Sequence, residues 1–129
     1  MHQPGIPIAF DWTEYLNLAK EIFPDTNLNC SQDAKLRCAI SRAYYAVFHK
    51  AMIKVLPGVR AKGFNSHNQV IDTLQESDDP DRRLLGVYLS NLKGKRKRAD
   101  YDDSVPNLPR LAEDALIEAE ELIDSFNAF

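Results

Sequence analysis

The chain is poor in the features that mark several classes of protein. Only two cysteines and three histidines occur in its 129 residues. Cys30 and Cys38 lie eight positions apart, which on a continuous helix is roughly 12 Å and too far for a disulfide. Because no C-x-x-C pair or histidine cluster occurs, the sequence predicts no structural zinc site. We expect no metal and no other cofactor.

Long apolar runs are also missing. No 18-residue apolar segment is present to span a membrane, and residues 1–5 lack the charged start of a secretory signal, so we expect no membrane association and a cytoplasmic location. The net charge of −3 and the pI near 5.6 argue against a protein whose whole surface binds nucleic acid. The length suits a single domain over residues 1–129.

No segment alternates apolar and polar residues as a half-buried strand does, and helical periodicity dominates instead. The clearest case is 31–56, which contains neither Pro nor Gly. Ser31 is placed to cap this long helix, and Pro57-Gly58 ends it. Its apolar stripe consists of Leu36, Ile40, Tyr44, Val47, Ala51 and Val55.

Weaker stripes predict further helices and hence the fold class. Asp79 and Pro80 are a cap and a first-turn residue for a helix that reaches the basic run, where Gly94 favours bending or fraying. A loop is expected over 100–106. The architecture is therefore an all-α antiparallel bundle of four to five helices. The other helices are expected over 11–23, 67–75 and 109 to about 127.

One flank of the long helix carries polar and aromatic side chains. Ser41, Tyr45 and Phe48 are spaced to share a ridge beside the apolar stripe. The ridge is either one wall of a polar pocket, with Ser41 and Tyr45 donating hydrogen bonds, or a helix or subunit contact that buries the rings. His49 has the chemistry of a general base, although a lone histidine on a helix is more often a half-buried polar residue. For His67 we expect a capping or surface role.

A basic run supplies the strongest local charge, with five cations in the six residues 93–98. These cations repel one another unless an anion or carboxylates offset them. The run either binds a polyanion such as RNA or a nucleotide phosphate, with strong salt dependence, or lies against the acidic last helix as a solvated face.

Two motifs together carry a resemblance to a known family. The segment 41–49, Ser-Arg-Ala-Tyr-Tyr-Ala-Val-Phe-His, and the segment 96–102, Arg-Lys-Arg-Ala-Asp-Tyr-Asp, are similar to those of the HEPN superfamily (higher eukaryotes and prokaryotes nucleotide-binding). The similarity is closest to small single-domain prokaryotic members and covers most of the chain from Ser31 to Phe126. It implies a helical bundle that forms a homodimer around the motif-bearing helices.

The resemblance also implies partners and an activity. Many relatives are encoded beside a minimal nucleotidyltransferase as a toxin-antitoxin pair, and some are metal-independent endoribonucleases with an Arg followed four to six residues later by His. Arg96 matches this arginine, but Tyr101 stands where a histidine is expected. A phenol ordinarily titrates near pH 10 and is a poor proton acceptor at neutral pH, whereas imidazole suits that role.

The sequence therefore predicts a HEPN-like protein that binds RNA or a nucleotide through its phosphate, working with a nucleotidyltransferase. The alternatives are a divergent metal-independent endoribonuclease, with Arg96 and Tyr101 as its catalytic residues or with His49, and a non-catalytic dimeric interaction module. The predicted binding residues are Ser41, Tyr45, Lys93, Lys95, Arg96, Arg98, Asp100 and Tyr101.

Overall fold

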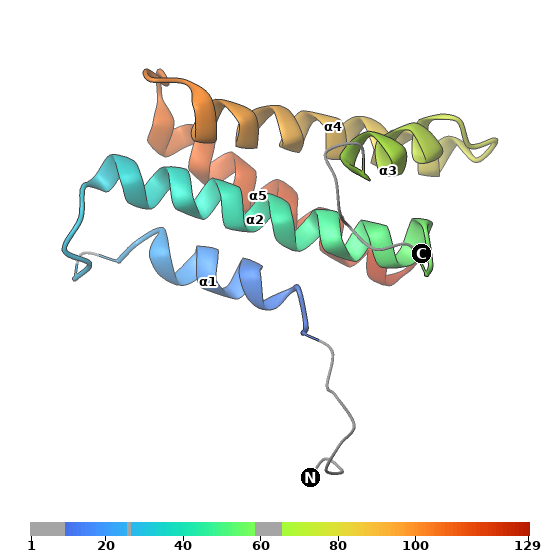
Figure 1. The fold of residues 1–129 in the computed structure, drawn as a ribbon, viewed down its shortest axis with the longest axis horizontal. Helices are drawn as coiled ribbons and strands as arrows, with labels where there is room; N and C mark the ends of the chain where they lie inside the picture. Colours follow the sequence, from blue (N-terminus) through green and yellow to red (C-terminus); the bar gives the residue numbers. More distant parts are fainter. Residues whose placement is uncertain (1–9, 26, 59–65) are drawn as a thin grey trace, which may run out of the picture.

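The computed structural model describes residues 10–25, 27–58 and 66–129, and within them the chain forms five helices and no strand. The predicted all-α bundle is confirmed. The helices run in a largely antiparallel arrangement (Figure 1). Their bounds are α1 Glu14–Ile22, α2 Gln32–Val55, α3 Ser66–Gln75, α4 Pro80–Tyr101 and α5 Leu108–Asn127.

Helix α2 is the centre of the bundle, because each of the other four helices packs against it (Figure 1). Ser31 caps it as expected, its Oγ accepting a hydrogen bond from the Ala34 amide at 3.1 Å. The predicted apolar stripe is buried up to Ala51, and Val55 is partly buried. Ile40 and Tyr44 are among the largest side chains that are completely covered.

Two predicted boundaries differ from the structure. Helix α1 begins at Glu14 rather than Asp11, because the Asp11 carboxylate binds the amide and hydroxyl of Thr13 in a turn. Helix α4 continues unbroken through Gly94 to Tyr101. The prediction that it bends or frays at Gly94 is therefore wrong, and the loop expected from residue 100 begins only after Tyr101. Packing overrides the weak helix propensity of Gly94, because the next residue, Lys95, pairs with Glu118 of α5 and Arg96 is buried.

The end of α4 is held by a side chain from α2. The Arg37 guanidinium donates to the carbonyl oxygens of Ala99 at 3.0 Å, Asp102 at 2.6 Å and Asp103 at 3.2 Å. The last turn of a helix leaves carbonyls without intrahelical partners, and Arg37 fills this need. The contact fixes the turn that carries Tyr101 against the first half of α2.

Among the described helices, none combines the length and the apolar composition that a bilayer span requires.

Candidate functional site

The packing of α4 on α2 brings together the two motifs that the sequence singled out. Arg96 of α4 is only 7% exposed and lies among three tyrosine rings. Its Cζ is 5.3 Å from the ring centroid of Tyr44, 5.6 Å from that of Tyr45 and 5.9 Å from that of Tyr101. Each ring lies close enough to attract the guanidinium through its π-face.

Asp100 is the only acidic partner of Arg96 within the described part of the chain, and it holds the arginine loosely. Its Oδ2 is 3.4 Å from Arg96 Nη1 and 3.4 Å from Ser41 Oγ, both longer than a typical hydrogen bond. Arg96 Nε is buried and has no hydrogen-bond partner among the described residues. A buried donor without an acceptor is costly, so this guanidinium has unused capacity to bind an anion.

His67 belongs to the same cluster, although the sequence suggested only a capping or surface role. Its Nδ1 is 2.6 Å from Tyr44 Oη, and its ring stacks on Phe48 with 4.0 Å between centroids. Burial lowers the pKa of His67 to about 4, and the positive charges of Arg96 and Lys93 contribute. The ring is therefore neutral at pH 7.

The sequence feature that could have pointed to His67 is Tyr44, the residue that His67 contacts. This tyrosine is completely buried in the middle of the apolar stripe, and a buried phenol needs a hydrogen-bond partner. Burial raises the pKa of Tyr44, so its hydroxyl stays protonated. The partner lies 23 positions away on another helix, which the sequence pattern alone does not reveal.

The basic run divides between two sides of α4. Lys93 lies one turn from Arg96 and donates to Asn68 Oδ1 of α3 at 2.9 Å. Burial, followed by the charges of Lys97 and Arg96, lowers the pKa of Lys93. Lys95 instead pairs with Glu118 of α5 at 2.7 Å. The run thus faces the cluster through Lys93 and the acidic helix through Lys95, and its binding of a polyanion stays a prediction.

Of the predicted site residues, Ser41, Tyr45, Arg96, Asp100 and Tyr101 converge, and Lys93 lies beside them. Lys95 and Arg98 lie elsewhere. Arg98 is exposed and two positions from Arg96, which on a helix is more than half of a turn away.

His49, the histidine of α2, contacts the turn that precedes α1. His49 stacks on Trp12 with 3.5 Å between ring centroids, and burial followed by the nearby charge of Arg42 lowers its pKa. Arg42 lies between two rings, with its Cζ 4.8 Å from Tyr15 and 5.2 Å from Tyr45. This aromatic layer joins the N-terminal helix to the flank of the cluster.

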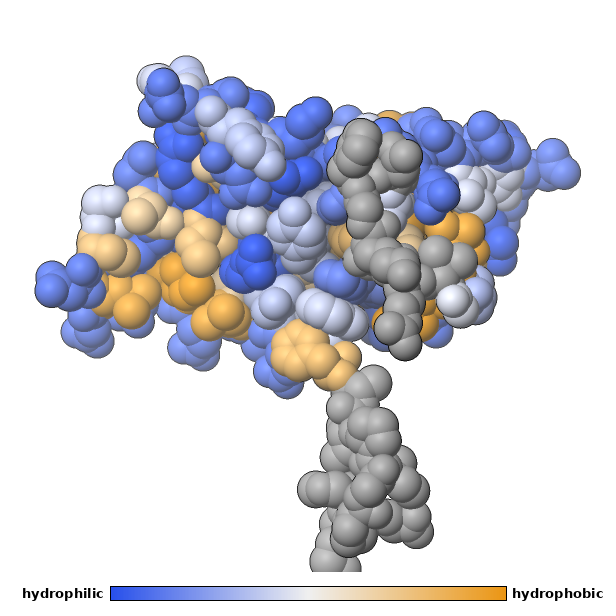
Figure 2. Space-filling view, viewed as in Figure 1, coloured by the Kyte–Doolittle hydropathy of each residue, from blue (hydrophilic) through white to orange (hydrophobic). Residues whose placement is uncertain are grey.

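Polar and apolar side chains are also separated on the surface of the molecule. Figure 2 shows a hydrophilic border along α4, whereas apolar side chains gather along α1 and the adjoining part of α2. In the described ranges, no group of three or more His, Cys, Asp or Glu side chains is arranged to hold a metal ion. Comparison with family models, curated proteins and solved structures finds no match to this chain.

Proposed function

We propose that the chain is a HEPN-like protein that binds RNA or a nucleotide through its phosphate, with Arg96 as the principal anion ligand. One observation carries the proposal: among the described residues, the nearly buried Arg96 has no acceptor for its Nε and a single carboxylate partner, Asp100, at 3.4 Å. A phosphate group would supply a negative charge close to Arg96 and an acceptor for its Nε. A guanidinium also forms paired hydrogen bonds to phosphate.

The residues around Arg96 suit such a ligand. Lys93 adds a second cation on the same side of α4, and Ser41 is a hydroxyl donor within reach of the same carboxylate. Tyr101 is 72% exposed, so its ring is free to stack on a base beside the phosphate. We further propose a nucleotidyltransferase as the protein partner, on the resemblance alone.

Asp100 provides the most discriminating test, because it competes with an incoming anion for Arg96. We expect Asp100→Asn to bind a labelled single-stranded RNA more tightly than the unaltered chain, and Arg96→Ala to lose binding. Arg110→Ala is the matched control, since Arg110 is an exposed arginine on α5 and should leave binding unchanged. The readout is fluorescence anisotropy, with circular dichroism to confirm that each variant is folded.

Salt supplies an independent check of the same site. Neutralising two or three phosphates predicts a roughly tenfold weaker affinity when salt rises from about 50 to about 200 mM. No binding at the lower concentration, or equal binding by Arg96→Ala and the unaltered chain, would remove the proposal.

A second candidate, a metal-independent endoribonuclease, is favoured by His67. Cleavage of RNA requires transfer of a proton from a 2′-hydroxyl as its oxygen attacks the adjacent phosphorus, which expels the 5′-oxygen and leaves a 2′,3′-cyclic phosphate. Tyr101 is ill suited to accept that proton, but neutral His67 reaches the cluster through Tyr44. A bound phosphate would offset the charges of Arg96 and Lys93, which raises the basicity of His67.

This candidate is tested with RNA in EDTA. We expect cleavage by the unaltered chain, none by Arg96→Ala and none by His67→Gln, with His49→Gln as the matched histidine control. Cleavage of equal rate in all four proteins would indicate a contaminating nuclease and exclude the ribonuclease. Binding without cleavage by the unaltered protein would also exclude it and leave the phosphate-binding function in place.

A further inference from the structure

A row of alternating arginines and aromatic rings leads from the Arg96 cluster across α2 to α1. In α4, the Arg96 Cζ is 5.9 Å from the ring centroid of Tyr101 and 5.6 Å from that of Tyr45 in α2. The Arg42 Cζ is 5.2 Å from the same Tyr45 centroid and 4.8 Å from that of Tyr15 in α1. Because α2 lies between α4 and α1 (Figure 1), the row crosses three helices.

The row ends in a group of three rings in and before the first turn of α1. The ring centroids of Phe10, Trp12 and Tyr15 lie 4.9 to 5.5 Å from one another. Phe10 is 50% exposed, and Tyr101 at the other end is 72% exposed. The row therefore has an exposed ring at each end and two cations within it. We define the arginine–aromatic row as Tyr101, Arg96, Tyr45, Arg42, Tyr15 and Phe10.

Arg42 has unused capacity to donate hydrogen bonds, as Arg96 has. Within the described ranges Arg42 forms no ion pair, and a hydrogen bond from its Nη2 to Ser41 Oγ is long at 3.4 Å. Its side chain is partly exposed. A guanidinium that stacks on rings keeps its N–H donors free, because they point outward in the plane of the group. Arg42 is therefore a second group that can bind a phosphate.

We infer that the arginine–aromatic row binds a single-stranded RNA segment, with two phosphates on Arg96 and Arg42 and with bases stacked on Tyr101 and Phe10. Cations that follow the backbone and rings that stack on unpaired bases are the two elements of single-strand binding. The inference rests on the proposed function, because Arg96 is the first phosphate ligand. It deepens that function by selecting a strand over a mononucleotide.

The length of the row is the reason for this selection. A mononucleotide on Arg96 carries one phosphate group and one base, so it leaves Arg42 and Phe10 unused. A row that crosses three helices suits a segment of about four to six nucleotides. Both guanidinium groups lie within 6 Å of the Tyr45 ring centroid, which is close enough for two phosphates of one strand to reach them.

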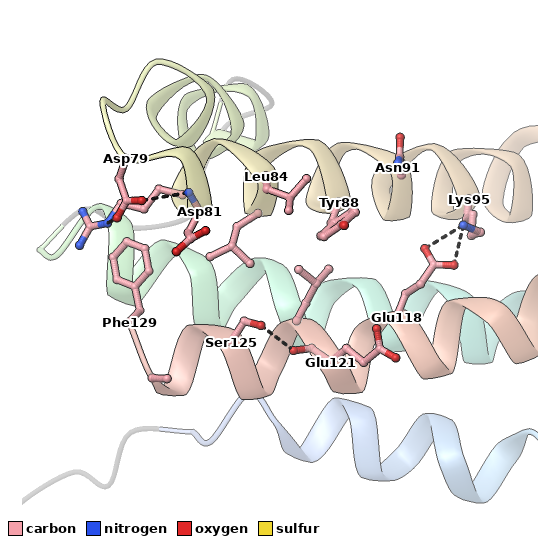
Figure 3. Close-up of a pocket in the computed structure, with 14 residues that line it drawn as sticks. Asp79, Asp81, Leu84, Tyr88, Asn91, Lys95, Glu118, Glu121, Ser125 and Phe129 are labelled. Carbon is pink, nitrogen blue, oxygen red and sulfur yellow. Dashed lines mark hydrogen bonds and ion pairs between the residues drawn. The ribbon is translucent and has the colours of Figure 1, made fainter.

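A groove of about 890 Å³ between α4 and α5 is separate from the row, whose six residues do not line it (Figure 3). Acidic and basic side chains line this groove together, among them Asp81, Arg82 and Glu121. Tyr88 projects from α4 toward α5 in the groove and is 48% exposed, nearly as much as Phe10. Tyr88→Ala is therefore the matched control for the loss of an exposed ring.

Fluorescence anisotropy of a labelled hexaadenylate tests the second phosphate contact. We expect Arg42→Met, which keeps an unbranched apolar stem between the rings, to weaken binding about tenfold. The slope of log affinity against log salt should become shallower by about 0.7. Arg110→Met is the matched control, because Arg110 is an exposed arginine of α5, and it should change neither value. If Arg42→Met lowers the free energy of unfolding but leaves the affinity unchanged, Arg42 only joins α1 to α2 and the inference is overturned.

The contacts with bases are tested by removing a ring. We expect Phe10→Ala to weaken the binding of hexaadenylate by at least about fivefold and to leave the binding of an abasic strand of the same length unchanged. Arg42→Met should weaken the binding of both strands, and Tyr88→Ala that of neither. Equal binding of hexaadenylate by Phe10→Ala and by the unaltered chain would contradict the role of this ring and overturn the row.

Arg96→Ala separates this inference from the proposed function. If this variant loses hexaadenylate while Arg42→Met and Phe10→Ala bind it as the unaltered chain does, the strand is excluded and the phosphate site at Arg96 stays. AMP that binds as tightly as hexaadenylate would have the same meaning. Failure of the unaltered chain to bind either molecule would overturn both. Circular dichroism confirms that each variant is folded.

Discussion

At the scale of single residues, the cluster at Arg96 shows what a linear pattern does and does not reveal. The spacing of Ser41 and Tyr45 placed them on one ridge, and the resemblance added Arg96, Asp100 and Tyr101. All five converge. His67 was not assigned to the site, because its link to the cluster is a contact across two helices rather than a spacing along one.

His67 leads to a prediction about pH. Its pKa is about 4 in the folded chain and near 6.5 when unfolded, so the folded state favours the neutral ring. The stability that this provides is complete above pH 6.5 and is lost as the pH falls toward 4. We expect His67→Asn to lose less stability than the unaltered chain between about pH 7.5 and about pH 4.5, by on the order of 1 kcal/mol after solvent screening of a partly buried ring.

Urea denaturation at the two pH values measures this difference. Equal losses for the two proteins would mean that His67 titrates in the folded chain as it does in the unfolded one.

At the scale of helices, caps were easier to predict than interruptions. Ser31 caps α2, and Asp79 caps α4 by accepting from the Asp81 amide at 2.9 Å. Both follow from local chemistry. Gly94 did not interrupt α4, because Lys93 before it bonds to Asn68 of α3 and Lys95 after it pairs with Glu118 of α5, and these contacts offset a propensity cost of about 1 kcal/mol. Local sequence cannot report such distant contacts.

The two glycines of α4 are predicted to respond in opposite ways to alanine. A Cβ at Gly94 would meet no atom within 4 Å, so Gly94→Ala should stabilise the protein by about 0.5–1 kcal/mol. A Cβ at Gly86 would lie 2.8 Å from Gln75 Cγ and 3.0 Å from Leu74 Cβ of α3. Gly86→Ala should therefore destabilise it by about 1–3 kcal/mol.

Thermal unfolding of the two variants beside the unaltered protein measures both signs. Stabilisation by Gly86→Ala would mean that α3 shifts freely on α4, and destabilisation by Gly94→Ala would mean that this glycine has a role that its open surroundings do not suggest.

At the scale of the whole molecule, α2 makes the bundle one cooperative unit, because every other helix packs on it. The all-α fold was predictable from periodicity, since each amphipathic stripe needs a partner. Which helices become neighbours was not, because the stripes are alike in composition. The groove between α4 and α5 (Figure 3) follows from the way the helices pack, and no motif in the sequence predicted it.

This organisation predicts that a core deletion in α2 weakens all helices together. Ile40 is completely buried, and Ile40→Ala should cost about 2–5 kcal/mol. We expect the urea transitions followed by far-UV circular dichroism and by Trp12 fluorescence to coincide in this variant. An earlier fluorescence transition would show that α1, next to which Trp12 lies, unfolds separately from the rest.

The hold of Arg37 on the carbonyls of Ala99, Asp102 and Asp103 limits where the polypeptide can be opened. Surface connections usually tolerate new chain ends or an inserted tag. The link between α4 and α5 should not, because lengthening it by even one residue displaces oxygens that a side chain some sixty positions earlier must reach. The short turn between α3 and α4, which no side chain of α2 fastens by a described hydrogen bond, is the better place for circular permutation.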